Sequence, residues 1–158
     1  MGRTRNVALM AFGVCLGFWS GAALAQDDGR DAWLLAPCSS CHGTFADGVK
    51  EDGGSEFPDG PSLRRTRLDP EEILMTVRCG RPGTPMPSFD PGAYTEFACH
   101  DLPLGPRPET LFGFPPMDDR TILEVVDFLV ANFVGKGRVT RDECTRLLGR
   151  ADLCGEYR

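Results

Sequence analysis

One short run constrains this chain more than any other feature of its sequence: Cys38-Ser39-Ser40-Cys41-His42. A C-x-x-C-H run is the attachment signature of c-type haem. Two intervening residues within one helical turn bring both sulfurs to the same edge of a porphyrin, where each can add to a vinyl group. The adjacent histidine then directs an imidazole nitrogen at the iron. We therefore predict one covalently bound haem c, with Cys38 and Cys41 as thioether donors and His42 as the proximal iron ligand.

Three other interpretations of this motif are weaker. A zinc ribbon needs a second cysteine pair at similar spacing, and the later cysteines offer no second C-x-x-C. A thioredoxin-like redox pair needs a strand–turn–helix setting, and the sequence contains no such pattern. A plain disulfide between Cys38 and Cys41 would require neither His42 nor an exported chain. Haem attachment accounts for all three residues together.

Residues 1–25 have the pattern of a secretory signal peptide. Arg3 and Arg5 form a basic start, an apolar run follows, and Ala23-Leu24-Ala25 gives the small-x-small pattern of a cleavage site. We expect cleavage after Ala25 and a periplasmic location. The alternative is a retained membrane anchor, because the apolar stretch from position 7 to position 25 approaches the ~20 residues that span a bilayer.

The charge balance excludes one class of partner. The whole chain has 17 Lys and Arg against 23 Asp and Glu, and removal of the signal peptide leaves 15 against 23, a net charge of −8. A nucleic-acid-binding protein would need a basic face to neutralise phosphates, so we expect no nucleic acid. An acidic chain instead favours a redox partner with a basic docking face. The length of 158 residues suits one domain, and we assign residues 26–158 to it.

The sixth iron ligand must come from elsewhere in the chain, and four residues are candidates. Met75 falls at core spacing on a predicted helix, so packing is its expected role. Met117 directly precedes a helix and could line or underlie the pocket, and His100 is the other histidine of the mature chain. Met86 lies in a loop with prolines on both sides, which lowers the entropy lost when a weak thioether ligand binds. We favour Met86, and Met/His ligation would raise the reduction potential.

Capping and periodicity predict only helices. A short apolar helix is expected over residues 31–36, stopped by Pro37. A second begins after an Asp cap at position 69 and ends at Gly80. The strongest begins at residues 118–119, carries apolar residues at i, i+3, i+4 and i+7, and has its C′ stop at Gly135. A last helix starts from a capping box at residues 140–143 and ends near residue 149.

With these features, residues 31–134 resemble a class I cytochrome c. The motif Cys38–Gly43, the segment Arg81–Phe89 and the closing amphipathic helix carry the resemblance. It implies an all-α fold of short helices wrapped around one haem, an exposed haem edge and one-electron transfer. By the same match, His42 is the proximal ligand and Met86 the distal one. The chain differs from small members of the family in its long insert after Met86 and in its cysteine-bearing tail, residues 135–158.

Four cysteines lie outside the motif in the mature chain, and we expect two disulfides, Cys79–Cys99 and Cys144–Cys154. Both close short loops, and neither conflicts with the expected helices. Closing a loop of about twenty residues is worth ~3 kcal/mol in the chain-entropy model. The first disulfide would enclose Met86 and either protect the iron–Met bond or only restrain a long loop. The second would fasten the tail.

Several arginines fall close to the expected haem in the sequence: Arg64, Arg65, Arg67, Arg78 and Arg81. The planar fork of a guanidinium suits carboxylates such as haem propionates. We expect one or two of these residues to hold propionates, and the sequence does not distinguish which.

The expected function is therefore that of a periplasmic electron-transfer protein and not of an enzyme, because a methionine-capped iron has no open position for a substrate. Its partners would be a dehydrogenase, an oxidase or a reductase, and one expected role is that of the dedicated acceptor of a periplasmic dehydrogenase. One alternative is a haem subunit anchored in a membrane respiratory complex. Another is a haem enzyme or gas sensor with a labile sixth ligand.

Overall fold

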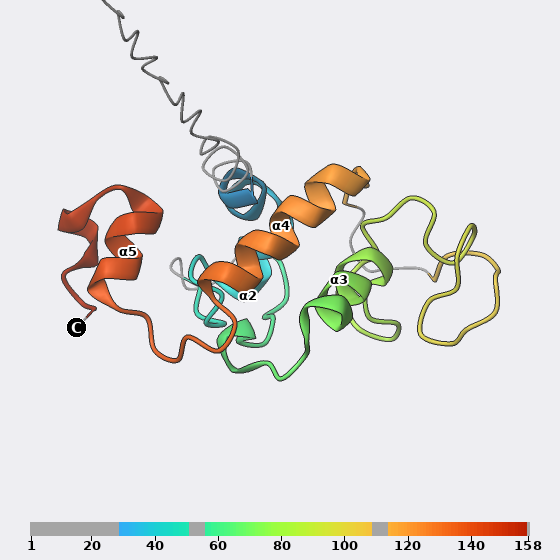
Figure 1. Ribbon diagram of the computed structural model, residues 1–158, viewed down its shortest axis with the longest axis horizontal. Coiled ribbons are helices and arrows are strands. Elements are labelled where there is room, and N and C mark those ends of the chain that lie inside the picture. Colours follow the sequence, from blue (N-terminus) through green and yellow to red (C-terminus); the bar gives the residue numbers. More distant parts are fainter. Residues whose placement is uncertain (1–28, 51–55, 109–113, 158) are drawn as a thin grey trace, which may run out of the picture.

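The computed structural model describes residues 29–50, 56–108 and 114–157. Its named helices are α2 (Pro37–His42), η1 (Leu63–Arg65), α3 (Pro70–Cys79), α4 (Asp119–Asn132), α5 (Arg141–Leu148) and η2 (Ala151–Cys154), and residues 29–35 are also helical (Figure 1). Over these ranges the chain forms no strand, only two isolated β-bridges. The predicted all-α fold is confirmed.

Helix α3 begins and ends where the sequence predicts. Asp69 accepts a hydrogen bond from the Glu72 backbone N–H, the Glu72 carboxylate accepts one from the Asp69 N–H, and Pro70 occupies the first turn. This capping box satisfies two of the donors that a helix N-terminus leaves free. Gly80 ends the helix at a φ of 66°, in the left-handed region.

Helix α4 forms the floor of the molecule. Its apolar stripe is buried along its length, at Ile122, Val125, Val126, Phe128 and Leu129. The helix ends at Asn132 with Phe133 as its C-cap, so the predicted stop at Gly135 is late. Gly135 instead closes the turn that follows, at a φ of 71°, and donates its N–H to the Arg64 carbonyl.

The N-terminal helical segment packs across α4. A Cβ at Gly29 would lie 2.4 Å from the Glu124 carbonyl oxygen, so the two backbones meet almost directly. Trp33 is buried against Phe133, with ring centroids 5.4 Å apart, and its indole N–H donates to the Thr44 carbonyl at 2.9 Å. After a bend at Ala36, Pro37 starts α2, so this proline both stops one helix and begins the next.

The tail, described over residues 135–157, lies beside this core and carries α5 and η2 (Figure 1). Its capping box at Thr140 and Glu143 and its left-handed C-cap at Gly149 agree with the sequence prediction. Both predicted disulfides, Cys79–Cys99 and Cys144–Cys154, are present, each with a Cα–Cα distance of 5.7 Å. None of the described helices has the length and hydropathy of a membrane span. The predicted signal peptide lies outside the described residues.

Candidate functional site

The C-x-x-C-H motif occupies helix α2. Pro37 presets the first turn, and the single short helix then places the two cysteines and the histidine within two turns of one another. Cys38 and Cys41 are free thiols, whereas the other four cysteines of the described chain form disulfides. Both thiols and His42 line the same pocket. The helix therefore presents two sulfurs and an imidazole to one cavity.

A backbone carbonyl fixes the orientation of His42. Its Nδ1 lies 2.9 Å from the Pro61 carbonyl oxygen, and a carbonyl can only accept, so Nδ1 carries the proton. In the neutral ring Nε2 then keeps its lone pair, which is the form that binds a metal. Burial lowers the pKa of His42, the Pro61 hydrogen bond opposes this, and the Arg81 charge adds to the lowering.

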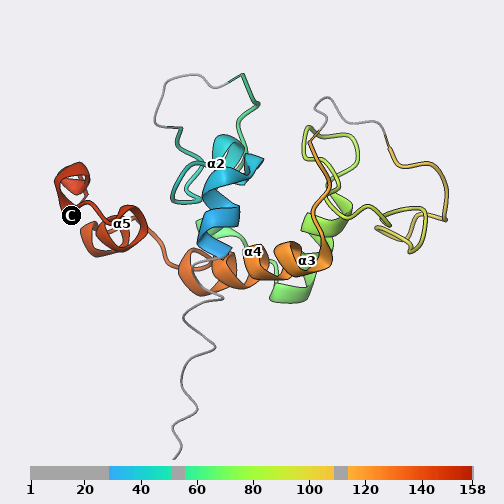
Figure 2. The same ribbon diagram turned by 90° about the horizontal axis from the view of Figure 1, so that it is seen from above.

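The pocket is about 520 Å³ in volume and mainly apolar, within the range of small-molecule and cofactor sites. Helix α2 provides one wall, and the loop around Met86 provides the opposite one. In Figure 2 these two parts stand on either side, with α4 beneath them. The floor consists of side chains from α3 and α4: Ile73, Val77, Val125 and Leu129.

Among the four candidates for the sixth ligand, only Met86 lines this pocket. Met75 lies on α3 with its side chain 39% exposed, so the expectation that it packs in the core is wrong. Its Sδ lies 3.3 Å from the Cys79 Sγ, on the side of α3 away from Ile73 and Val77. Met117 is partly buried against the core, and His100 donates to the Gly80 carbonyl.

The Met86 loop is attached to the end of α3 on both sides. The Arg81 N–H donates to the Met86 carbonyl at 3.1 Å, and the Phe89 N–H donates to the Val77 carbonyl at 3.3 Å. The hydroxyl of Thr84 accepts from the Met86 N–H within the loop. The prolines at positions 85 and 87 stiffen the backbone around the thioether.

The structure separates the five arginines that the sequence left equivalent. Arg64 is buried and donates to Glu143 and to carbonyls of the tail, and Arg78 pairs with Asp90 and Asp119. Arg67 is exposed and does not line the pocket, whereas Arg65 and Arg81 do. These two exposed guanidinium groups are the cations available to an anionic ligand at the rim.

The motif thiols do not have the electrostatics of a reactive redox pair. Burial raises the pKa of Cys38 to about 12 and also raises that of Cys41. Catalytic dithiols instead have a depressed pKa that exposes a thiolate. No cluster of three or more His, Cys, Asp and Glu side chains suited to a metal ion occurs in the described part of the chain. The large, mainly apolar cavity suits a bulky apolar cofactor.

Residues 25–96 match a family model described as cytochrome C oxidase, cbb3-type, subunit III. Residues 25–96 therefore carry a c-type cytochrome domain. The matched segment contains α2, α3 and the Met86 loop, and a domain of this kind binds haem c and transfers electrons. No curated protein and no solved structure gives a significant match to the chain.

Sequence reasoning missed two residues of this pocket, Gly60 and Pro61. Pro61 supplies the carbonyl that orients His42, and a Cβ at Gly60 would lie 2.6 Å from the His42 Nδ1. The only signal for them was the run Pro58-Asp59-Gly60-Pro61, which is typical of an ordinary turn.

Proposed function

We propose that this protein is an exported carrier of single electrons, with haem c bound through Cys38, Cys41, His42 and Met86. One observation carries the proposal: the two thiols, an imidazole with a free Nε2 and a single methionine line opposite walls of one apolar cavity. Thioether bonds to the cysteines would fix the cofactor to α2. Bound haem supplies an iron that cycles between ferric and ferrous states.

The chain's own residues set the properties of that iron. The Pro61 carbonyl holds the His42 ring, and the stiff loop holds the Met86 sulfur on the opposite side. A methionine ligand raises the reduction potential relative to a second histidine. If His42 and Met86 both bound the iron, no position on it would remain for a substrate, and the apolar walls of the pocket would limit the access of water. Such a centre exchanges electrons and does not catalyse a substrate reaction.

In this proposal Arg65 and Arg81 orient the cofactor. Both line the rim of the pocket, whereas Arg64 and Arg78 already pair with carboxylates. We assign them to the haem propionates, which would face the rim while the apolar ring enters the cavity. Pairing there would neutralise the rim cations and leave the negative charge of the domain to guide docking.

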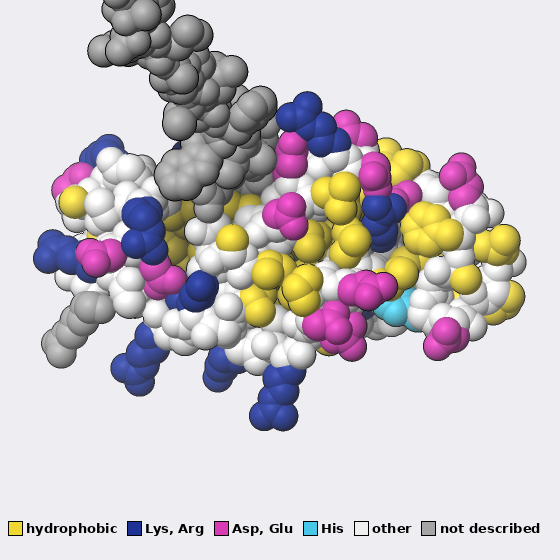
Figure 3. Space-filling view, in the orientation of Figure 1, with side chains coloured by type: hydrophobic (Ala, Val, Ile, Leu, Met, Phe, Trp, Pro, Cys, Tyr) yellow, Lys and Arg dark blue, Asp and Glu magenta, His cyan; other side chains and the backbone are white. Residues whose placement is uncertain are grey.

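The partner we propose is a redox protein with a basic docking face, in the periplasm. The tail contains six Lys and Arg against four Asp and Glu, which leaves nine against nineteen in residues 26–134. In Figure 3 the basic side chains gather over α5 and along the lower edge. The electron-transfer rate with a basic partner should fall as ionic strength rises, because salt screens the attraction.

A second candidate is a haem subunit of a membrane respiratory complex. The description of the matching family, an oxidase subunit, favours it, and a retained N-terminal segment would provide the anchor. Fractionation of cells that produce the full chain separates the two cases. Recovery of the haem-stained protein in the soluble periplasmic fraction supports the carrier, and recovery in the membrane supports the subunit.

Expression of the full chain with a c-type maturation system tests the cofactor and its ligands. We expect a pyridine haemochrome spectrum typical of haem c, pigment that does not extract into acid acetone, and a ferric Met–iron charge-transfer band. Met86→Ala should abolish that band, lower the potential and allow carbon monoxide to bind the ferrous protein. Met117→Leu serves as the matched control and should keep the band. A colourless protein, or a Met86→Ala variant that retains the band, would contradict the proposal.

A further inference from the structure

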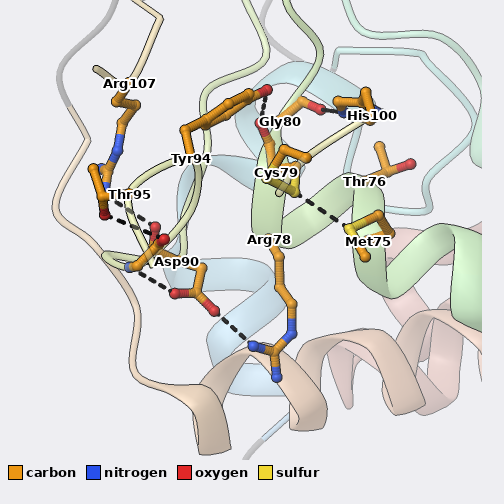
Figure 4. Close-up of a disulfide and its surroundings, with 12 residues drawn as sticks. Met75, Thr76, Arg78, Cys79, Gly80, Asp90, Tyr94, Thr95, His100 and Arg107 are labelled. Atoms are coloured by element: carbon orange, nitrogen blue, oxygen red, sulfur yellow. Dashed lines mark hydrogen bonds and ion pairs between the residues drawn. A yellow bond between two sulfur atoms is a disulfide. The ribbon is translucent and has the colours of Figure 1, made fainter. Parts of the chain in front are cut away.

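The insert after the Met86 loop builds a second, smaller core at the end of α3. Its buried members are Cys79, Ala93, Tyr94 and Cys99, and Phe97 packs against them. Figure 4 shows this region, with the disulfide joining the end of the helix to the insert. The residues of this small core do not contribute to the main core.

Two side chains of the insert reach the last carbonyls of α3. The Tyr94 hydroxyl donates to the Cys79 carbonyl at 2.9 Å, and the His100 Nε2 donates to the Gly80 carbonyl at 2.8 Å (Figure 4). The final carbonyls of a helix have no partner within the helix, so side chains or water must satisfy them. Here Tyr94 and His100 take that place, and the disulfide Cys79–Cys99 adds a covalent link beside them.

The clamped end of α3 is also the part that contacts the Met86 loop. A Cβ at Gly80 would lie 2.4 Å from the Pro87 carbonyl carbon, so the two backbones are in direct contact. The next residue, Arg81, donates its N–H to the Met86 carbonyl. His100 therefore holds a peptide that touches the residue after Met86, without contacting Met86 itself.

The backbone of the insert takes an unusual path to place these side chains. Tyr94 and His100 have φ values of 68° and 53°, and Asp101 has 60°, although none of the three is glycine. Such left-handed residues are uncommon and persist where surrounding contacts hold them. The Tyr94 N–H donates to the Phe97 carbonyl, and the Tyr94 carbonyl accepts from the Gly105 N–H.

We propose that Tyr94 and His100 are positioning residues that hold the end of α3, and through it the Met86 loop, so that Met86 stays on the iron. The inference rests on the proposed function, because it requires Met86 to be the distal ligand. It assigns a role to the long insert, whose described residues 90–108 do not line the cavity. Loss of either hydrogen bond should free the loop and let an external ligand compete with Met86.

Imidazole binding to the ferric holoprotein tests this inference. A neutral hydrogen bond is worth about 1 kcal/mol net, so Tyr94→Phe and His100→Ala should each bind imidazole about fivefold more tightly than the unaltered protein. The Met–iron charge-transfer band should also disappear at a lower temperature. His100→Gln keeps an N–H donor, so its imidazole affinity and the temperature at which its band disappears should be close to those of the unaltered protein. Leu104→Ala is the matched control, because this residue of the same insert has an exposed side chain.

The outcomes separate the inference from the proposed function. If the unaltered protein lacks the charge-transfer band, Met86 is not the ligand and both statements fail. If the unaltered protein has the band and both variants bind imidazole with unaltered affinity, only the inference fails. It also fails if the band is lost only together with global unfolding. Tyr94→Phe retains the buried ring, so the test stands even where His100→Ala gives no holoprotein.

Discussion

At the scale of single residues, His42 depends on a neighbour that has no side chain. Gly60 donates its N–H to the Cys41 carbonyl at 2.7 Å and lies directly against the His42 ring. A Cβ there would meet Nδ1 at 2.6 Å and Cε1 at 2.8 Å, well inside van der Waals contact. The ring is buried and cannot turn aside without losing the Pro61 carbonyl. The pocket wall beside His42 therefore excludes any larger residue at position 60.

We expect Gly60→Ala to destabilise the holoprotein by about 1–3 kcal/mol, the usual cost of overpacking a close-packed site. Urea unfolding followed by the haem absorbance measures the change. Gly155→Ala is the matched control, because a Cβ there meets nothing within 4 Å and its φ of −63° suits alanine. If Gly60→Ala is as stable as Gly155→Ala, the site accommodates a Cβ beside the His42 ring and this prediction is wrong.

The residues that the sequence revealed and those it did not differ in the range of their interactions. Cys38, Cys41 and His42 are recognisable because the motif is contiguous within one helical turn. Tyr94 and His100 contact residues 15 and 20 positions earlier, through a backbone that non-glycine residues rarely adopt. No local pattern encodes such contacts. For the same reason the sequence offered five candidate arginines and did not single out the two, Arg65 and Arg81, that line the pocket.

At the scale of elements, α3 contributes both to the core and to the wall of the pocket. Its Asp69 cap and its glycine stop were predicted from the sequence, because capping depends on residues within one turn. Its burial was predicted wrongly at one position, because Met75 is exposed while Ile73 and Val77 are buried in the core. Which side of a helix is covered depends on where a distant helix lies. The end of α4 at Asn132 depends in the same way on Gly135 meeting the Arg64 carbonyl.

The two disulfides offer a comparison between elements. Cys79–Cys99 closes a sequence separation of 20 around Met86, and Cys144–Cys154 closes one of 10 in the tail. We expect removal of either, by paired Cys→Ala changes, to cost about 3 kcal/mol of unfolding free energy. Only the loss of Cys79–Cys99 should also weaken the iron–Met bond. The measurement is the Met–iron charge-transfer band of each variant during heating.

The tail variant Cys144→Ala/Cys154→Ala serves as the control for lost stability alone. Its band should persist until the protein unfolds, whereas the band of Cys79→Ala/Cys99→Ala should fade earlier. If the bands persist equally in both variants, the disulfide Cys79–Cys99 only restrains a long loop and does not protect the iron–Met bond.

At the scale of the whole molecule, one buried ion pair joins the tail to the core. Arg64 is 3% exposed, and its guanidinium contacts the Glu143 carboxylate at 3.0 Å and the Arg138 carbonyl at 3.2 Å. Glu143 also belongs to the capping box of α5. The same carboxylate thus starts the tail helix and neutralises a cation beneath the core. The tail therefore contributes to the stability of the fold, although it lies outside the segment that matches the family model.

This pair predicts a particular dependence of stability on pH. Burial raises the pKa of Glu143, but hydrogen bonds from Thr140 and Arg64 outweigh it and hold the pKa below the ordinary value of 4.5. A lowered folded pKa means that the stabilisation is complete above the unfolded value and is lost as the pH falls through the folded one. The free energy of unfolding of the unaltered protein should therefore decrease as the pH falls below 4.5.

Glu143→Gln tests the pair, because it keeps the shape of the side chain and removes its charge. Breaking a buried pair from one side costs about 3–5 kcal/mol, and we expect the lower end because three backbone carbonyls still accept from Arg64. Urea unfolding of the holoprotein from pH 7 to pH 3 should show a smaller stability at pH 7 and a flatter acid limb. Glu156→Gln, an exposed change in the same tail, should follow the unaltered protein. Parallel acid limbs for Glu143→Gln and the unaltered protein would assign the acid sensitivity to other carboxylates.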